Sequence, residues 1–423
     1  MLSLFFTPMR KLYRLMKRRQ AILAGNTPDR CRRIERVHPV SGKRLAAMTF
    51  DDGPCASPAR PGDGTALTTA LLSTLDRYGA RGTFNVIGTT AGNYPDREGR
   101  LGGPLWSGVL YDHYPEFGQD SLAGVVNQPE MTRAMAESGH ELTNHGYSHV
   151  AFGPMRVIYG TRRHLADAAA GEADVKRLDD LVEQLTGRRP RLARPPHYID
   201  RTADGQTAYD IYRRSGHLYL AASYDAGGWR PAGSYRQSVE SMVGRMEALL
   251  KRDPDALNGA IISQKNGYNM NKESPVVDAL PRQLEILKAH GYEIVTVSEL
   301  LAASPFADTA PEDPTAADAR TLLAAGATVA YRDNTLKPDR PVTWAEFRGL
   351  LDFGSARSIL PVVLPTGPVT SGALLELLPT VPAAPTAEIG VLRYQDSPLL
   401  RRHAFRFAVL ILGLAGQAGE NKE

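Results

Sequence analysis

Cysteine, long apolar runs and two common catalytic motifs are scarce or missing in this sequence, and each gap excludes a class of protein. Only Cys31 and Cys55 occur among 423 residues, so we expect neither a disulfide framework nor a zinc site built from thiolates. No apolar run reaches the ~20 residues that span a bilayer, which predicts no transmembrane helix. Gly-x-Ser-x-Gly and phosphate-cradling glycine motifs are absent, which disfavours a serine esterase and a nucleotide-binding enzyme.

Basic charge is concentrated at one end of the chain. The formal net charge is +4, but the first 36 residues contribute +8 and the remainder −4. This distribution argues against a basic nucleic-acid groove spread over the fold. We expect a basic N-terminal segment at residues 1–40, either resting on an anionic membrane surface or forming a solvated helix. Its apolar residues precede its charges, the reverse of a secretory signal.

Apolar, β-prone runs alternate with segments of helical spacing through the middle of the chain, which predicts parallel strand–helix units. Because the pattern covers residues 41–303, close to the ~250 residues of a (β/α) barrel, we expect an α/β fold with a distorted TIM-like barrel. Prolines among Ser, Asp and Glu at 302–315 predict a linker, so residues 304–423 form a linker and a small, mostly helical module. The expected strands are 45–50, 83–87, 218–224, 260–263 and 293–297.

Polar side chains follow several β-prone runs where each run ends. Asp51 and Asp52 follow the first run, and His145, Arg194 and Asp225 follow later ones. The carboxyl ends of parallel strands face the same side of an α/β fold. We therefore expect these side chains to converge on one site.

His145 and His149 have the spacing of a metal-ligand pair. Four residues apart on a helical turn, both rings would face one divalent ion. Such a pair also occurs by chance, and it gains weight only with a carboxylate ligand, which Asp52 or Asp51 could supply. Two imidazoles and one carboxylate leave coordination positions open for water and substrate.

The adjacent aspartates can divide two tasks, since one serves as ligand and the other as base. A bound metal lowers the pKa of water to ~7, and a neighbouring carboxylate can take the remaining proton. Arg194 would keep that carboxylate ionised and oriented. Without the histidines, Asp-Asp-Gly-Pro would be interpreted as an ordinary turn.

Four motifs together resemble the polysaccharide deacetylases, the NodB homology domain of carbohydrate esterase family 4. Thr-Phe-Asp-Asp-Gly-Pro at 49–54 is similar to the family's first motif and His-Gly-Tyr-Ser-His at 145–149 to its second. Arg-Pro-Pro at 194–196 is similar to the third, and Asp225 with Trp229 to the fourth. The resemblance covers about residues 43–301. It implies a metal-dependent hydrolase that removes N-acetyl or O-acetyl groups from a polysaccharide, at the cell surface or outside the cell.

The resemblance also implies roles for individual residues. Asp51 would be the general base, and Arg194 would orient it with support from Asp225. Trp229 would form part of the apolar wall around the acetyl methyl, although an ordinary core aromatic explains it nearly as well. The implied metal ligands, most simply for Zn²⁺, are Asp52, His145 and His149, and the implied substrate pocket includes Trp229, Tyr198 and Gln264.

The fifth motif departs from the family, which has a histidine after an apolar strand as the general acid. Here the strand leads into Gln264-Lys265-Asn266. Lys265 could serve as the acid if burial lowers its pKa, or His197 could serve from the opposite side. Alternatively, the site binds sugar without turning it over, as a catalytically impaired protein of the same fold.

Two further segments carry expectations. The long stretch 88–128, rich in Gly, Asp and aromatic residues, is either a surface elaboration or a lid that faces sugar rings. Residues 331–338 with 341–347 resemble one S-layer homology repeat, with Trp344 where arginine is usual, and 368–370 begins at best half a copy. The resemblance implies binding to a cell-wall polymer, and a degenerate helical appendage is the alternative.

Overall fold

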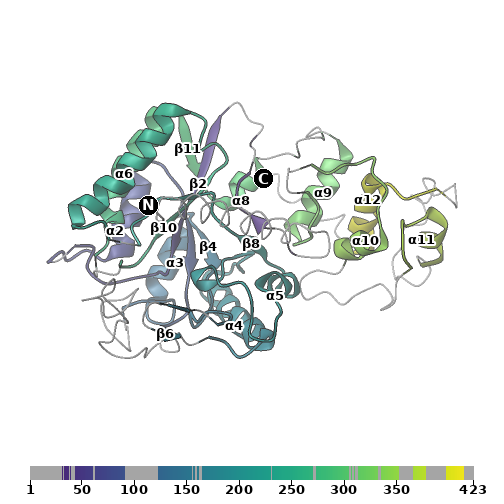
Figure 1. Ribbon diagram of the computed structural model, residues 1–423, viewed down its shortest axis with the longest axis horizontal. Helices are drawn as coiled ribbons and strands as arrows, with labels where there is room; N and C mark the ends of the chain where they lie inside the picture. The colour runs from purple at the N-terminus through teal and green to yellow at the C-terminus, as the bar shows by residue number, and fades with distance from the viewer. Residues whose placement is uncertain are drawn as a thin grey trace, which may run out of the picture. The chain divides into compact units, whose positions relative to one another are not determined.

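Nine strands form one sheet in the computed structural model (Figure 1), which describes residues 31–413 with gaps, the longest at 91–121, 352–364 and 378–396. The strand order is β1-β8-β7-β4-β3-β2-β10-β9, and β11 also pairs with β2. The pairs from β7 through β4, β3, β2 and β10 to β9 are all parallel. The strands are β1 (Arg33–Ile34), β2 (Arg44–Asp51), β3 (Thr83–Val86), β4 (Glu141–Asn144), β7 (Leu192–Ala193), β8 (Leu218–Leu220), β9 (Tyr224–Asp225), β10 (Ile261–Lys265) and β11 (Tyr292–Val295); a separate hairpin joins β5 (Arg156–Val157) to β6 (Gly160–Thr161).

The sheet is curled, and a short segment links its two sides. Ile34 accepts a hydrogen bond from the Ala221 amide beyond β8 (2.7 Å), and Val37 donates one to the Gly259 carbonyl just before β10 (2.9 Å). The predicted α/β, barrel-like class is therefore confirmed, as a curled parallel sheet with helices. All five predicted strand runs coincide with strands of this sheet.

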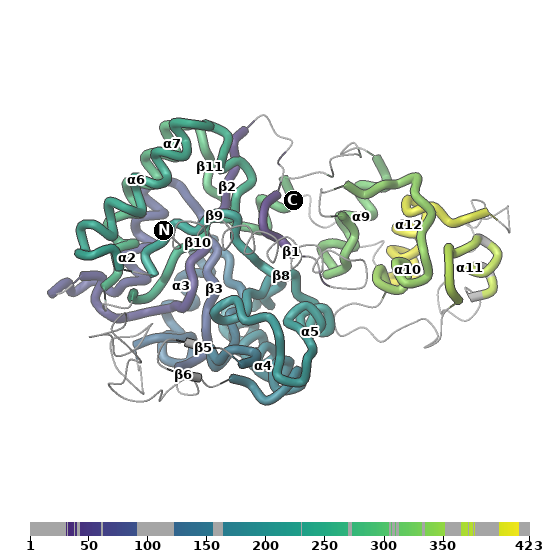
Figure 2. The backbone as a smooth tube through the Cα atoms, in the orientation of Figure 1, coloured from purple at the N-terminus to yellow at the C-terminus, as the bar shows by residue number. Residues whose placement is uncertain are grey.

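Helices pack on the sheet because their apolar residues recur at helical spacing. In α2, Leu67, Leu71 and Leu75 lie on one buried face, and the central strand β2 is buried from Leu45 to Phe50. Figure 2 follows the backbone through these alternating units. The helices are α2 (Leu67–Arg77), α3 (Pro129–Glu137), α4 (Ala168–Thr186), the 3₁₀ turn η2 (Pro196–Tyr198), α5 (Ala208–Ser215), α6 (Tyr235–Arg252), α7 (Val276–Ala289) and α8 (Val297–Ala302).

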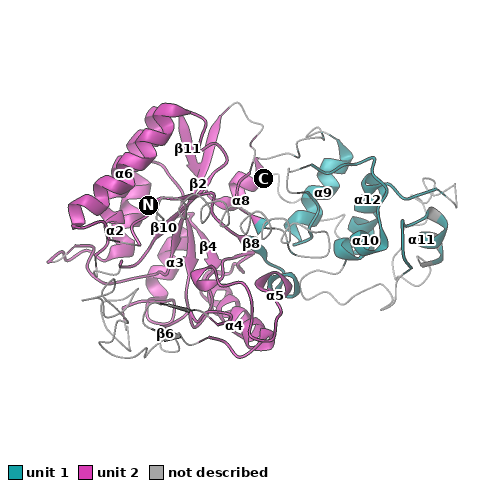
Figure 3. Cartoon of the chain, in the orientation of Figure 1, with its two compact units in different colours: residues 1–33, 212–219, 305–423 teal, residues 34–211, 220–304 magenta. Residues whose placement is uncertain are grey.

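The chain divides into two compact units, coloured separately in Figure 3, and the described part of residues 305–423 belongs to the unit drawn in teal, together with residues 212–219. Four helices lie in this part: α9 (Pro314–Ala324), α10 (Trp344–Leu351), α11 (Ser371–Leu377) and α12 (Arg401–Ile411). They share a separate apolar core that includes Phe347, Leu374 and Phe405. The described part of residues 305–423 is therefore helical. The domain boundaries expected from the sequence stay a prediction.

Three similar strand-to-helix segments close into a ring in this unit. Val342 donates its amide hydrogen bond to Leu399 (2.8 Å), Leu399 donates to Val369 (2.7 Å), and Val369 donates to Val342 (2.8 Å). All three residues are buried, and each lies two positions before the first residue of α10, α12 or α11. A third segment with the same backbone bonds therefore lies at residues 398–401, which sequence reasoning missed because Leu399-Leu400 stands where the other two segments have Val-Thr.

Some predicted features lie outside the described residues. These are most of the basic segment 1–40, including the stretch proposed to meet a membrane, most of the stretch proposed as a lid, and residues 332–334 of the S-layer-like motif. Among the helices that the structure does describe, none is long and apolar enough to cross a bilayer.

Candidate metal centre

The centre begins where β2 ends. Asp51 is the last residue of β2, and Asp52 follows in a left-handed conformation (φ 84°) with its carboxylate buried. Glycine is required at position 53, because a Cβ there would lie 1.8 Å from Nδ2 of Asn266. The backbone therefore turns sharply after β2, and neighbouring aspartates have separate sets of contacts.

The two histidines lie on a loop after β4 and not on the helical turn that their spacing predicts. Gly146 (φ 83°) and His149 (φ 53°) both adopt left-handed backbone conformations, which break any helix and curl the loop. The correction leaves the pair intact, since the ring centroids lie 5.2 Å apart. A tight loop thus brings the rings together as a helical turn would.

Helix α4 fixes the histidine loop from outside. Asp174 accepts a hydrogen bond from the Ser148 amide (3.0 Å), and burial raises the pKa of the Asp174 carboxyl against the effect of such bonds. Asn144 accepts from the Gly146 amide (2.8 Å) and donates to Asp179 of α4 (2.8 Å). Residues outside the centre therefore determine the direction of both imidazoles.

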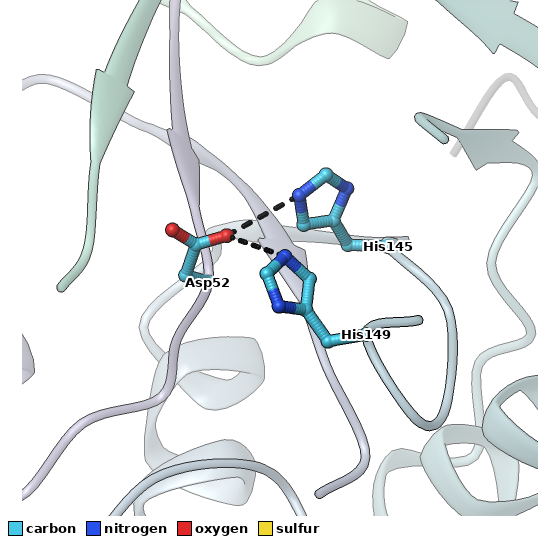
Figure 4. Close-up of side chains that lie close together, drawn as sticks. All are labelled: Asp52, His145 and His149. Atoms are coloured by element: carbon cyan, nitrogen blue, oxygen red, sulfur yellow. Dashed lines mark ion pairs between the residues drawn. The ribbon is translucent and has the colours of Figure 1, made fainter. Parts of the chain in front are cut away.

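Asp52, His145 and His149 converge around one point (Figure 4). Oδ1 of Asp52 lies 3.3 Å from Nε2 of His145 and 3.1 Å from Nε2 of His149. One possible ligand atom from each residue lies within 4.8 Å of the other two, and all three residues are buried. This is the candidate metal site, and the sequence predicted its members.

The donor set fits a divalent cation. Nδ1 of His145 lies 2.8 Å from the Arg194 carbonyl, which can only accept, so Nδ1 carries hydrogen and, in the neutral ring, the lone pair is on Nε2. That lone pair faces a carboxylate oxygen, and a cation between two electron-pair donors satisfies both. Ligating histidines in metal sites are oriented in this way by a hydrogen bond from their other nitrogen.

Asp51 is held beside this centre by two donors. Nη1 of Arg194 and Nδ2 of Asn85 each lie 2.5 Å from the same oxygen, Oδ1. Arg194 is fully buried, and its guanidinium also donates to Thr49 (3.0 Å) and to the Leu220 carbonyl (3.2 Å). Two charge-assisted or polar hydrogen bonds thereby fix the carboxylate in direction.

Asn85 is a site residue that sequence reasoning missed. It lies on β3 in register with Asp51, and its Oδ1 accepts a short hydrogen bond from Thr143 of β4. Three adjacent strands therefore form a polar chain from Thr143 through Asn85 to Asp51. The available signal was a polar residue inside the otherwise apolar run 83–87.

Both candidates for the general acid lie close to the metal ligands. Lys265 pairs in register with Asp51 on the neighbouring strand, and its ammonium forms an ion pair with Oδ2 of Asp52. The ring of His197 lies 5.0 Å from that of His149, centroid to centroid. The geometry keeps both candidates open.

The remaining predicted residues lie further from the ligands. Asp225 accepts from the Gly227 amide (2.8 Å) and from the indole of Trp229 (3.0 Å); no bond joins it to Arg194 among the described contacts. The indole is 44 % exposed, so it is not a core aromatic, and the ring of Tyr198, which lies 5.5 Å from the Arg194 guanidinium, is 40 % exposed.

Gln264, which the sequence assigned to the substrate pocket, lies on β10 next to Lys265. Side chains alternate along β10, so Gln264 and Lys265 point to opposite faces. Gln264 is buried in register with Phe50, with its amide nitrogen 3.9 Å from the Met48 sulfur. Its proposed place in the substrate pocket is therefore at odds with the alternation of the strand.

Comparison with known proteins shows which proteins the chain resembles. Residues 39–208 match the family model for polysaccharide deacetylase. The match contains Asp51, Asp52, His145, His149 and Arg194.

Curated relatives agree with this class. A peptidoglycan-N-acetylglucosamine deacetylase of Bacillus cereus is 26% identical over 268 residues, which are 62% of this chain and 90% of the relative. The peptidoglycan-N-acetylmuramic acid deacetylase PdaC of Bacillus subtilis is 26% identical over 163 residues, which are 38% of this chain and only 23% of PdaC. The solved structure of PdaC superposes with a TM-score of 0.40 at 21% identity, covering 62% of this chain and 92% of that one.

Proposed function

We propose that residues 41–303 form a metal-dependent deacetylase that hydrolyses N-acetyl or O-acetyl groups of a cell-wall or related polysaccharide. One observation carries the proposal: the Asp52, His145 and His149 ligand set lies beside Asp51, whose carboxyl group is oriented by Arg194 and Asn85. The similar peptidoglycan deacetylases support a cell-wall substrate and a location at the cell surface or outside the cell.

The chain's own residues divide the work of hydrolysis. Asp52, His145 and His149 would hold a divalent ion, most simply Zn²⁺, which supplies Lewis-acid polarisation of the acetyl carbonyl. Asp51 would take a proton from the attacking water. As the carbon–nitrogen bond breaks, acetate forms, and the departing amine takes a proton from Lys265 or His197. Trp229 and Tyr198 offer exposed rings to a sugar.

Acetate release tests this proposal. The full chain, loaded with Zn²⁺, is incubated with acetylated chito-oligosaccharides, peptidoglycan and acetylated xylan, and Asp51→Asn serves as the matched control. We expect release from at least one polymer and a loss of about 100-fold or more in Asp51→Asn. Equal release by both proteins would remove Asp51 from the mechanism.

A catalytically impaired, carbohydrate-binding protein of the same fold is the second candidate function. The observation that favours it is Lys265, which stands in the fifth motif where the family has histidine and pairs with a metal ligand. In that case the chain retains acetylated oligosaccharides in a binding assay but releases no acetate with any metal.

We further propose that the C-terminal unit binds a cell-wall polymer, as S-layer homology repeats do. The support is the ring of three similar segments through Val342, Val369 and Leu399, because a repeated unit can offer equivalent surfaces to a repeating polymer. Pull-down of the full chain by purified cell walls, compared with a chain ending at residue 304, tests this. Equal retention of the two proteins would reject it.

A further inference from the structure

The carboxylate of Asp52 is shared between two kinds of partner. Its Oδ1 faces the imidazoles of His145 and His149, while its Oδ2 accepts the ammonium of Lys265. The site therefore has a cation of its own on one side of the ligand carboxylate. A ligand set of two neutral imidazoles and one carboxylate alone has no such charge.

The strand register places this ammonium. Lys265 is the last residue of β10 and pairs with Asp51, so its side chain projects from the face of the sheet that bears the centre. Its side chain is 12% exposed, and that of Asp52 is 3% exposed. Water screens a pair with so little exposure only weakly, so the attraction is stronger than in a surface ion pair.

We propose that Lys265 is an internal counter-ion of the metal centre, which stabilises the metal-free site and competes with the metal for Asp52. Without a metal, Lys265 neutralises a carboxylate that would otherwise be buried and short of positive charge. With a metal, the ammonium remains close to a second cation and draws electron density from the shared carboxylate. Both effects weaken metal binding.

The proposal rests on the metal centre of the proposed function, but it concerns affinity and not catalysis. Like charges a few ångströms apart in a mostly buried site repel strongly. We therefore expect removal of the Lys265 charge to tighten metal binding by about tenfold or more. We also expect removal of this charge to lower the melting temperature of the metal-free protein. The difference in melting temperature between the metal-free and metal-loaded forms should therefore widen.

The test measures Co²⁺ affinity of the full-length protein without substrate. Wild type, Lys265→Met and Lys265→Gln are stripped with a chelator and titrated against a chromophoric competitor, while the melting temperature is followed with and without Co²⁺. Lys251→Met is the matched control, because that lysine is 68% exposed on α6 and its loss changes the net charge equally. Its Co²⁺ affinity should stay within about threefold of wild type.

Tighter Co²⁺ binding by either neutral Lys265 variant, with no gain in Lys251→Met, supports the counter-ion. Equal or weaker binding by both variants overturns it, as does equal tightening in Lys251→Met. The outcome is independent of the deacetylase proposal: a chain that shows the affinity gain but never releases acetate keeps the counter-ion and loses the enzyme. A chain that releases acetate but shows no gain in Co²⁺ affinity keeps the enzyme and loses the counter-ion.

Discussion

Arg194, which directly follows β7, forms an ion pair with Asp51, the last residue of β2, with 2.5 Å between Nη1 and Oδ1. The arginine side chain is fully buried and that of the aspartate is 14% exposed. A buried pair of this kind contributes little net stability, but the loss of one partner leaves an uncompensated charge. The pair therefore ties the geometry of the site to the stability of the fold.

Replacing Arg194 should destabilise the protein as well as inactivate it. For Arg194→Leu we expect a loss of ~3–5 kcal/mol in the free energy of unfolding, measured by urea titration, because Asp51 stays buried and unpaired. Arg282→Leu is the control, since Arg282 is 43% exposed and pairs with Glu240 on the surface. It should lose no more than ~1 kcal/mol. Similar losses in the two variants would contradict this account of the buried pair.

Asn85 should affect turnover because it orients the carboxylate of Asp51. Asn85→Leu fills a similar volume but donates nothing to Oδ1, so Asp51 can rotate about its remaining contact with Arg194. We expect kcat to fall by up to about 100-fold with little change in KM. Thr143→Val, which removes the hydroxyl that orients Asn85, should shift kcat in the same direction by less. Unchanged kcat in both variants would show that the polar chain is structural only.

The fold and the core of the site were predictable from sequence because both follow short-range rules. Apolar runs such as 45–50 show which strands are buried, and polar residues directly after them, such as Asp52 and His145, show where strands end. Asn85 could not be found in this way, because its role depends on strand register, which a single sequence does not specify. The place of Gln264 stays a prediction, although alternation along β10 directs Gln264 and Lys265 to opposite faces.

The general acid can be assigned by comparing two single variants. If Lys265 donates the proton, Lys265→Ala loses about 100-fold or more in kcat and His197→Ala retains most of it. The opposite pattern assigns His197, whose ring centroid lies 5.0 Å from that of His149. Wild-type turnover and pH profile in both variants would exclude both residues.

His140 should make stability depend on pH. Burial lowers the pKa of its imidazole, with a smaller opposing effect of Asp76, and the Gly82 amide donates to Nδ1 (3.1 Å). The folded state thus favours the neutral ring: the contribution is complete above the unfolded pKa of ~6.5 and is lost as pH falls towards the lower folded pKa. We expect the urea midpoint of wild type to drop more between pH 7.5 and 5 than that of His140→Leu. Parallel drops would contradict this assignment.

The central claim is that Asp52, His145 and His149 hold one divalent ion, and metal stoichiometry tests it most directly. After removal of metal by a chelator and reloading with Zn²⁺, wild type should retain about one ion per chain and melt at a higher temperature than the metal-free form. The double variant His145→Ala/His149→Ala should retain none and show no such rise. One ion per chain in the double variant, or none in wild type, would contradict the account.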